Sequence, residues 1–113
     1  GEYDLGSRGT LRMADRGMVL PLAMGHEIVG RVAKWGPGAE GKVAKGDVRL
    51  VFPWVGCGAC ARCRADEENM CAVRPRALGV FQNGGYATHV LATHWKHLLP
   101  IEGLDPALAA TYA

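Results

Sequence analysis

The sequence predicts a small, mainly β domain, either a barrel or a sandwich, on the basis of three observations. Short runs rich in β-branched residues recur along the chain, and they do not alternate with helical patterns as in a parallel α/β fold. Sixteen glycines and six prolines in 113 residues provide many turns. The apolar content of 49% is ordinary for a globular protein and argues against disorder.

The first half of the chain is expected to form a loop and two strands. Residues 1–20 show little periodicity and predict a loop. A strand is predicted over 26–35, in which Gly30 indicates a bend or a close backbone approach. The turn-rich stretch 36–47 then leads to a second strand at 48–54.

The second half is expected to hold a cysteine loop, a hairpin and the start of a helix. The loop spans 56–76, and an Asn-Gly-Gly turn at 83–85 predicts a hairpin whose return strand is 86–91. A further short strand is predicted at 97–100. Asp105 is a candidate N-cap with proline after it, and the alanine-rich helix is expected to run to the end of the chain.

The charges are nearly balanced, with 13 Lys and Arg against 11 Asp and Glu. A net charge of +2, spread along the chain, argues against a nucleic-acid partner. No apolar run approaches the roughly 18 residues that a membrane span needs, and no signal segment opens the sequence. We therefore expect a cytoplasmic protein with no membrane partner.

All four cysteines lie within fifteen residues, in the segment GCGACARCRADEENMC. Their spacing, C-x2-C-x2-C-x7-C, lets the thiolates turn toward one centre, and four sulfurs at about 2.3 Å suit Zn²⁺. Flanking glycines let backbone amides approach the sulfurs, and the neighbouring Arg62 and Arg64 favour thiolates. The predicted ligands of one structural zinc ion are Cys57, Cys60, Cys63 and Cys71.

Other interpretations of the cysteines fit less well. Disulfides would suit a secreted protein, and ordinary reduced cysteines would not cluster beside charged residues. A ferredoxin run ends in C-x3-C followed by proline, whereas here the last gap is seven residues and Ala72 follows. A nucleic-acid-binding zinc ribbon needs two separated C-x2-C knuckles, which the chain lacks. A closed site of four sulfurs has no open position for substrate, so its role is structural.

Four short motifs, in this order, resemble the medium-chain zinc-containing alcohol dehydrogenases over roughly residues 20–113. The motifs are Gly25-His26-Glu27, Gly46-Asp47-Val48-Arg49, the cysteine run from Gly56, and Gly84-Gly85-Tyr86-Ala87. The resemblance implies that 1–113 is an incomplete GroES-like catalytic domain, a partial barrel with a zinc-binding cysteine lobe at 56–76. A Rossmann domain for NAD(P) follows in the whole enzyme. No G-x-G-x-x-G fingerprint occurs here, so this chain alone is not expected to bind the nicotinamide cofactor.

By the same resemblance, His26 matches the family's histidine ligand of the catalytic zinc, and Glu27 matches its acidic neighbour. The implied reaction is hydride transfer between a small-molecule alcohol or aldehyde and NAD(P). The remaining histidines, His89, His94 and His97, are expected to be surface or packing residues.

The sequence also departs from the family. The cysteine ligand upstream of the histidine has no counterpart before His26, and the third ligand would follow the helix that starts near Pro106. We therefore expect an internal fragment that is inactive alone. Missing barrel strands would expose a sheet edge, which predicts a homo-oligomer. A stand-alone zinc-stabilised binding module without catalysis stays open as the alternative.

Overall fold

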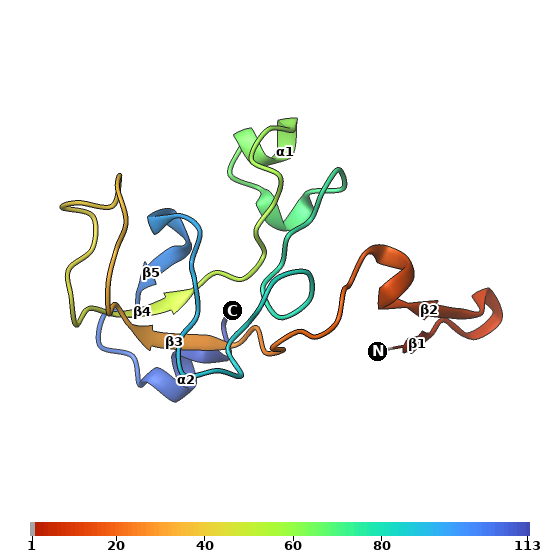
Figure 1. Cartoon of the computed structure of the whole chain (residues 1–113), viewed down its shortest axis with the longest axis horizontal. Coiled ribbons are helices and arrows are strands. Elements are labelled where there is room, and N and C mark those ends of the chain that lie inside the picture. Colours follow the sequence, from red (N-terminus) through yellow and green to blue (C-terminus); the bar gives the residue numbers. More distant parts are fainter. Residues whose placement is uncertain (1) are drawn as a thin grey trace.

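The computed structural model describes residues 2–113, and it is elongated, with extents of 49 × 31 × 25 Å. An N-terminal hairpin projects from a body that carries the cysteine lobe at one side (Figure 1). No helix in the described part of the chain is long and apolar enough to cross a membrane. The helices and strands, in chain order, are β1 (Glu2–Asp4), η1 (Gly6–Arg8), β2 (Thr10–Arg12), η2 (Met13–Arg16), β3 (Ile28–Arg31), β4 (Val48–Val51), α1 (Ala61–Arg64), η3 (Glu68–Met70), η4 (Trp95–His97), β5 (Leu98–Pro100) and α2 (Pro106–Ala110).

The body is built on an antiparallel sheet with the strand order β3-β4-β5. Ile28 pairs with Val51, which in turn pairs with Leu98 on the other side. Ile28 and Val51 are buried together with Leu78, which is 2% exposed, so the register places the apolar positions of β3 and β4 in one core. The mainly β class predicted from the sequence is confirmed.

The predicted strands exist, but they are shorter than expected. The first covers Ile28–Arg31 and the second ends at Val51, before Pro53, which has no N–H to donate to a ladder. Gly30 was expected to mark a bend or a close approach, and this is wrong: its φ is not positive, and a Cβ there would meet no atom within 4 Å. The short strand Leu98–Pro100 lies within the range predicted for it.

The return strand expected at 86–91 does not form. The chain after the Asn-Gly-Gly turn instead bonds to a distant segment: Gly84, Gly85 and Tyr86 donate backbone N–H groups to the carbonyls of residues 23–25 at 2.7–2.8 Å. This irregular pairing uses N–H groups that a hairpin partner would have bonded, and residues 85–88 form bends instead of a strand.

The predicted start of the C-terminal helix is confirmed and its predicted end is wrong. The Asp105 carboxylate accepts hydrogen bonds from the N–H groups of Ala107 at 2.9 Å and Leu108 at 3.1 Å, with Pro106 at the first position. The helix ends at Ala110, since the Thr111 hydroxyl donates to the Leu108 carbonyl at 2.8 Å and the last turn tightens.

The N-terminal region was expected to be a loop, but it forms a small antiparallel hairpin. Glu2 pairs with Arg12 across β1 and β2, and the Leu5 N–H donates to the Gly9 carbonyl at 2.8 Å in the connecting turn. Each strand is three residues long, with one apolar residue between two polar ones, which is too short a pattern to predict a strand.

Candidate metal centre

The cysteine lobe follows β4 and is held by two short turns. The one-turn helix α1 sets Cys60 and Cys63 a turn apart, with the Arg64 N–H bonded to the Cys60 carbonyl at 3.0 Å. Asp66 then adopts a left-handed φ of 58°, and η3 follows, with the Cys71 N–H bonded to the Glu68 carbonyl at 3.0 Å. These two turns carry Cys71 back toward the first three cysteines.

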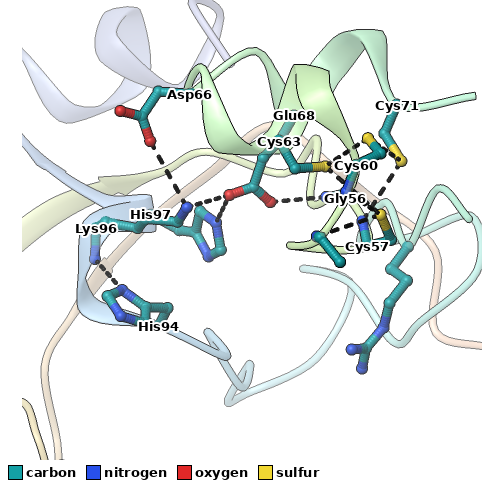
Figure 2. Close-up of polar contacts among 12 residues, drawn as sticks. Gly56, Cys57, Cys60, Cys63, Asp66, Glu68, Cys71, His94, Lys96 and His97 are labelled. Atoms are coloured by element: carbon teal, nitrogen blue, oxygen red, sulfur yellow. Dashed lines mark hydrogen bonds and ion pairs between the residues drawn. The ribbon is translucent and has the colours of Figure 1, made fainter.

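The four sulfurs converge on one point (Figure 2). All four Sγ atoms lie within 4.8 Å of one another. The closest Sγ to Sγ distances are 3.9 Å for Cys57 and Cys63, 3.5 Å for Cys60 and Cys63, and 3.9 Å for Cys60 and Cys71. In a regular tetrahedron with metal–sulfur bonds of about 2.3 Å, sulfurs are roughly 3.8 Å apart. The donor set therefore fits a tetrahedral thiolate-binding cation such as Zn²⁺.

Backbone amides surround two of the sulfurs. The Cys57 sulfur accepts from the N–H groups of Ala59 at 3.4 Å and Cys60 at 3.3 Å, and these bonds lower the pKa of Cys57. The N–H groups of Arg74 and Cys57 lower the pKa of Cys71 to about 6. Cys71 is thus favoured as a thiolate at neutral pH, and the same kind of contact shifts the pKa of Cys57 in the same direction.

Cys63 has the opposite preference. Its side chain is 4% exposed, and burial raises the pKa of its thiol to about 12. This sulfur stays protonated at neutral pH unless a cation compensates its charge. The lobe therefore combines Cys71, whose thiol ionises readily, with the buried Cys63 thiol, which would ionise on binding a cation and release its proton.

The glycine before the first cysteine is a packing requirement. A Cβ on Gly56 would lie 2.5 Å from the Cys63 sulfur and 3.0 Å from the Cys71 Cβ. Any other residue at this position would push two of the sulfurs outward. Gly58 has a φ of +75°, which favours glycine in the turn between the first two cysteines.

The two arginines of the lobe do not act as the sequence suggested. Arg62 forms an exposed ion pair with Glu67 at 2.6 Å, and the Arg64 guanidinium donates to the Ala59 carbonyl at 2.7 Å. The lowered pKa values of Cys57 and Cys71 come chiefly from backbone N–H groups instead. The two arginines thus stabilise the surface of the cysteine loop through these contacts.

A buried polar cluster beneath the lobe was missed by sequence reasoning (Figure 2). Glu68, 6% exposed, accepts a hydrogen bond from the Gly56 N–H at 2.8 Å and pairs with Lys96 and His97 from the η4 turn. Nothing in the sequence separates Glu68 from the exposed Glu67 beside it. Of the three later histidines, His89 and His94 are exposed as expected, and His97 is the buried one.

Charges in this cluster are set by its contacts. Burial raises the pKa of Glu68, but hydrogen bonds from Lys96, Gly56 and His97 outweigh burial and lower it to about 2. Burial lowers the pKa of His97, against the attraction of Glu68. Glu68 is therefore an anion near neutral pH and accepts from the His97 Nε2 at 3.4 Å, while within residues 2–113 the buried His97 Nδ1 has no hydrogen-bond partner.

His26 and Glu27 lie elsewhere, at the entry to β3, and both are exposed. The His26 ring lies 5.4 Å from that of Trp54. His26 and Glu27 line a cavity of about 320 Å³, and its other lining residues are Tyr3, Met13, Met18, Met24, Gly25, Gly79, Val80 and Tyr86. Within residues 2–113, only the four cysteines form a group of His, Cys, Asp and Glu close enough to hold a metal. His26 belongs to no such group, although Glu27 lines the same cavity.

Glycines fix the backbone beside His26. A Cβ on Gly84 would lie 2.0 Å from the Gly25 carbonyl oxygen, and one on Gly79 would lie 2.5 Å from the same oxygen. Gly25 itself has a φ of +92°, and a Cβ there would meet the Tyr86 ring at 2.6 Å. The absence of side chains at Gly25, Gly79 and Gly84 thus allows the segment at residues 23–25 to contact the segment at residues 79–86.

Comparison with known proteins identifies the family. The model of the alcohol dehydrogenase GroES-like domain matches residues 4–103. An NAD-dependent alcohol dehydrogenase of Sulfurisphaera tokodaii is 42% identical over 106 residues, covering 93% of this chain and 30% of that protein. An L-threonine 3-dehydrogenase of Saccharopolyspora erythraea is 33% identical over 103 residues, covering 88% and 28%.

Solved structures agree. The D-arabinose dehydrogenase of Sulfolobus solfataricus matches with a TM-score of 0.73 at 32% identity, covering 80% of this chain and 27% of that one. The chain spans less than a third of the length of these relatives. The match over most of the chain and the sequence identities show that this chain belongs to the medium-chain, zinc-type alcohol dehydrogenase family and carries its GroES-like domain.

Proposed function

We propose that the cysteine lobe binds one structural zinc ion through Cys57, Cys60, Cys63 and Cys71. The observation that carries this proposal is the convergence of the four sulfurs at distances suited to tetrahedral thiolate coordination. Bound zinc would link the two turns of the lobe and couple metal binding to folding. Thiolate sites need reducing conditions, and we place the protein in the cytoplasm.

We propose that the protein to which this domain belongs is a zinc-dependent alcohol dehydrogenase that transfers hydride between a small alcohol or aldehyde and NAD(P). The family membership and the names of the similar dehydrogenases support this function. The chain described here would contribute one side of the substrate site and no cofactor-binding surface. By itself it would not turn over alcohol.

Within that enzyme, we propose that His26 is a ligand of the catalytic zinc and that Glu27 lies beside it. A catalytic zinc would polarise the substrate oxygen. The imidazole of His26 is exposed at the rim of a cavity, free to coordinate a cation, and Glu27 can balance the charge of that cation. The Trp54 ring beside His26 restricts its orientation.

A chimera tests this function. Residues 20–103 of this chain would replace the matching segment of the Sulfurisphaera tokodaii alcohol dehydrogenase, which aligns well enough for the exchange. The chimera should oxidise alcohols with NAD, and His26→Ala should lower kcat/KM at least about a hundredfold. His89→Ala, an exposed histidine, serves as the control and should keep the activity. A folded, zinc-loaded chimera without activity would contradict the proposal.

The second candidate function is a zinc-stabilised binding module without catalysis. It is favoured by one observation: within the described residues, His26 belongs to no group of three or more His, Cys, Asp and Glu side chains that could hold a metal. The chimera separates the two candidates, because a binding module would not restore alcohol oxidation to the host enzyme.

We further propose that the chain forms a homo-oligomer through the open edge of β3. The Val32 N–H bonds to the Asp47 carbonyl at 2.9 Å, and antiparallel bonding alternates along a strand. The backbone groups of Val29 and Arg31 therefore face away from β4, toward an open groove of about 590 Å³. Pairing with the same edge of a second copy would satisfy them by an isologous contact.

Sedimentation of the wild-type chain and two variants tests this pairing. Val29→Pro removes an outward N–H and should give only monomers, since proline is tolerated on the free side of an edge strand. Val29→Ala keeps the N–H and should leave the oligomer intact. Monomeric wild-type protein at high concentration would contradict the proposal.

A further inference from the structure

The cysteine lobe is joined to the sheet body by one buried carboxylate. Both oxygens of Glu68 are used: Oε2 accepts from the Gly56 N–H at 2.8 Å, and Oε1 faces Lys96 and His97, with the His97 Nε2 at 3.4 Å. Gly56 directly precedes the first cysteine, whereas Lys96 and His97 lead into β5. Glu68 thus lies between the lobe and the body (Figure 2).

We infer that Glu68 is a positioning residue for the metal centre, which holds the Gly56–Cys57 peptide in the orientation that the four-sulfur site requires. This inference rests on the proposed zinc site. Gly56 packs directly against the sulfur site, where even a Cβ would not fit, since it would lie 2.5 Å from the Cys63 sulfur. The hydrogen bond from the Gly56 N–H to Glu68 therefore orients the peptide that leads into Cys57. The Cys57 N–H in turn donates to the Cys71 sulfur at 3.4 Å.

A carboxylate is needed because both sides of the position present donors. The Gly56 N–H lies on one side and the Lys96 ammonium on the other. A glutamine has one acceptor oxygen and one donor NH₂, so either orientation would set a donor against a donor. The nearby Glu67 has no such role, because it is exposed and pairs with Arg62 on the surface.

Zinc affinity of three proteins tests this role: the wild-type chain, Glu68→Gln, and the matched control Glu67→Gln from the same loop. Affinity would be measured by competition with a chromophoric chelator, and Co²⁺ absorption would report whether four thiolates bind the metal. Loss of an outer-shell partner of a metal ligand typically costs about 10–100-fold in affinity. We expect a loss in this range for Glu68→Gln and less than about twofold for Glu67→Gln.

Two further measurements separate positioning from general destabilisation. In the zinc-loaded protein, Glu68→Gln should speed amide hydrogen exchange at Gly56 and Cys57 while the β3–β4 ladder exchanges as in the wild type. The double variant Glu68→Gln with Lys96→Met removes the opposed donor and should recover part of the lost zinc affinity.

The outcomes distinguish the two proposals. If the wild type binds Co²⁺ through four thiolates and Glu68→Gln binds zinc as tightly as the wild type, the role of Glu68 is overturned and the zinc site stands. Equal losses in Glu68→Gln and Glu67→Gln would also overturn it. If the wild type binds no metal through its thiolates, the zinc site itself fails, and the role of Glu68 fails with it.

Discussion

The cysteine lobe and the His26 cavity are two regions of one domain that are assembled in different ways. The four cysteines span fifteen residues, and two short turns bring their sulfurs within 4.8 Å of one another. The cavity at His26 is lined by residues from Tyr3 to Tyr86, and within the described chain His26 belongs to no group of three or more side chains that could hold a metal. A site built from adjacent turns can be complete within part of a protein, whereas one gathered from distant segments depends on the rest.

The two regions also differ in how their surroundings hold them. Backbone N–H groups approach the sulfurs of Cys57 and Cys71, and Glu68 fastens the lobe from below. Around His26, the fixed features are backbone contacts between glycines, and the side chain itself is exposed. We therefore expect substitutions to have large effects on the folded state in the lobe and small ones at His26.

Cys60→Ser should have the largest effect, because a structural zinc site contributes folding free energy directly. We expect the zinc-loaded chain to lose roughly 3 kcal/mol or more of its unfolding free energy, measured by denaturant unfolding. The exposed Ala59→Ser in the same loop is the control and should change little. If Cys60→Ser had the same stability and metal content as the wild type, the cysteine lobe would not be the more sensitive of the two regions.

Gly84→Ala should have the next largest effect, at the cavity. The new Cβ would lie 2.0 Å from the Gly25 carbonyl oxygen, a backbone atom that cannot move freely. We expect a loss of about 1–3 kcal/mol of unfolding free energy, with zinc content unchanged. Gly30→Ala is the control, since its Cβ would meet no atom within 4 Å. Zinc lost together with stability in Gly84→Ala would show that the two regions are coupled.

A smaller effect should appear as a dependence of stability on pH. Burial lowers the pKa of His97 below its ordinary value near 6.5, so the unfolded chain takes up a proton first as the pH falls. Stability should then decline on acidification below about pH 6.5, with a slope from this group of at most about 1.4 kcal/mol per pH unit. Unfolding of His97→Gln between pH 8 and 5 should show a shallower decline. An identical pH profile in His97→Gln would contradict this assignment.

His26→Ala should have the smallest effect on the isolated chain. The side chain is exposed, and its one aromatic neighbour within the described residues is Trp54. We expect the melting temperature and the zinc content to match those of the wild type. A marked loss of stability would mean that His26 has a structural role, which would favour the binding-module alternative.

Local chemistry explains what the sequence could predict. The helix start at Asp105-Pro106 and the strands near Ile28 and Val48 depend on neighbouring residues, and the structure confirms them. The cysteine spacing is equally local, and the four sulfurs converge as it predicts. Shared motifs were enough to identify the family and the GroES-like domain.

Long-range contacts explain what it could not. Residues 84–86 satisfy their N–H groups on residues 23–25, and no local pattern separates this arrangement from the hairpin return that was expected. Glu67 and Glu68 are chemically identical neighbours, and only the arrival of Lys96 and His97 from a distant turn makes one of them part of the site. The sequence also suggested that Arg62 and Arg64 favour thiolates. In the structure both lie in the short helix α1, where Arg62 pairs with Glu67 and Arg64 bonds to the Ala59 carbonyl.

The central claim is that the four cysteines form a complete metal site in this chain while His26 does not. Zinc content per chain, measured by plasma emission spectrometry on chelator-washed protein, tests it most directly, with an absorbance spectrum recorded alongside. The account predicts one zinc per chain, a colourless sample, and no zinc in Cys60→Ser. Wild-type protein without zinc, or a sample with visible iron–sulfur absorbance, would contradict it.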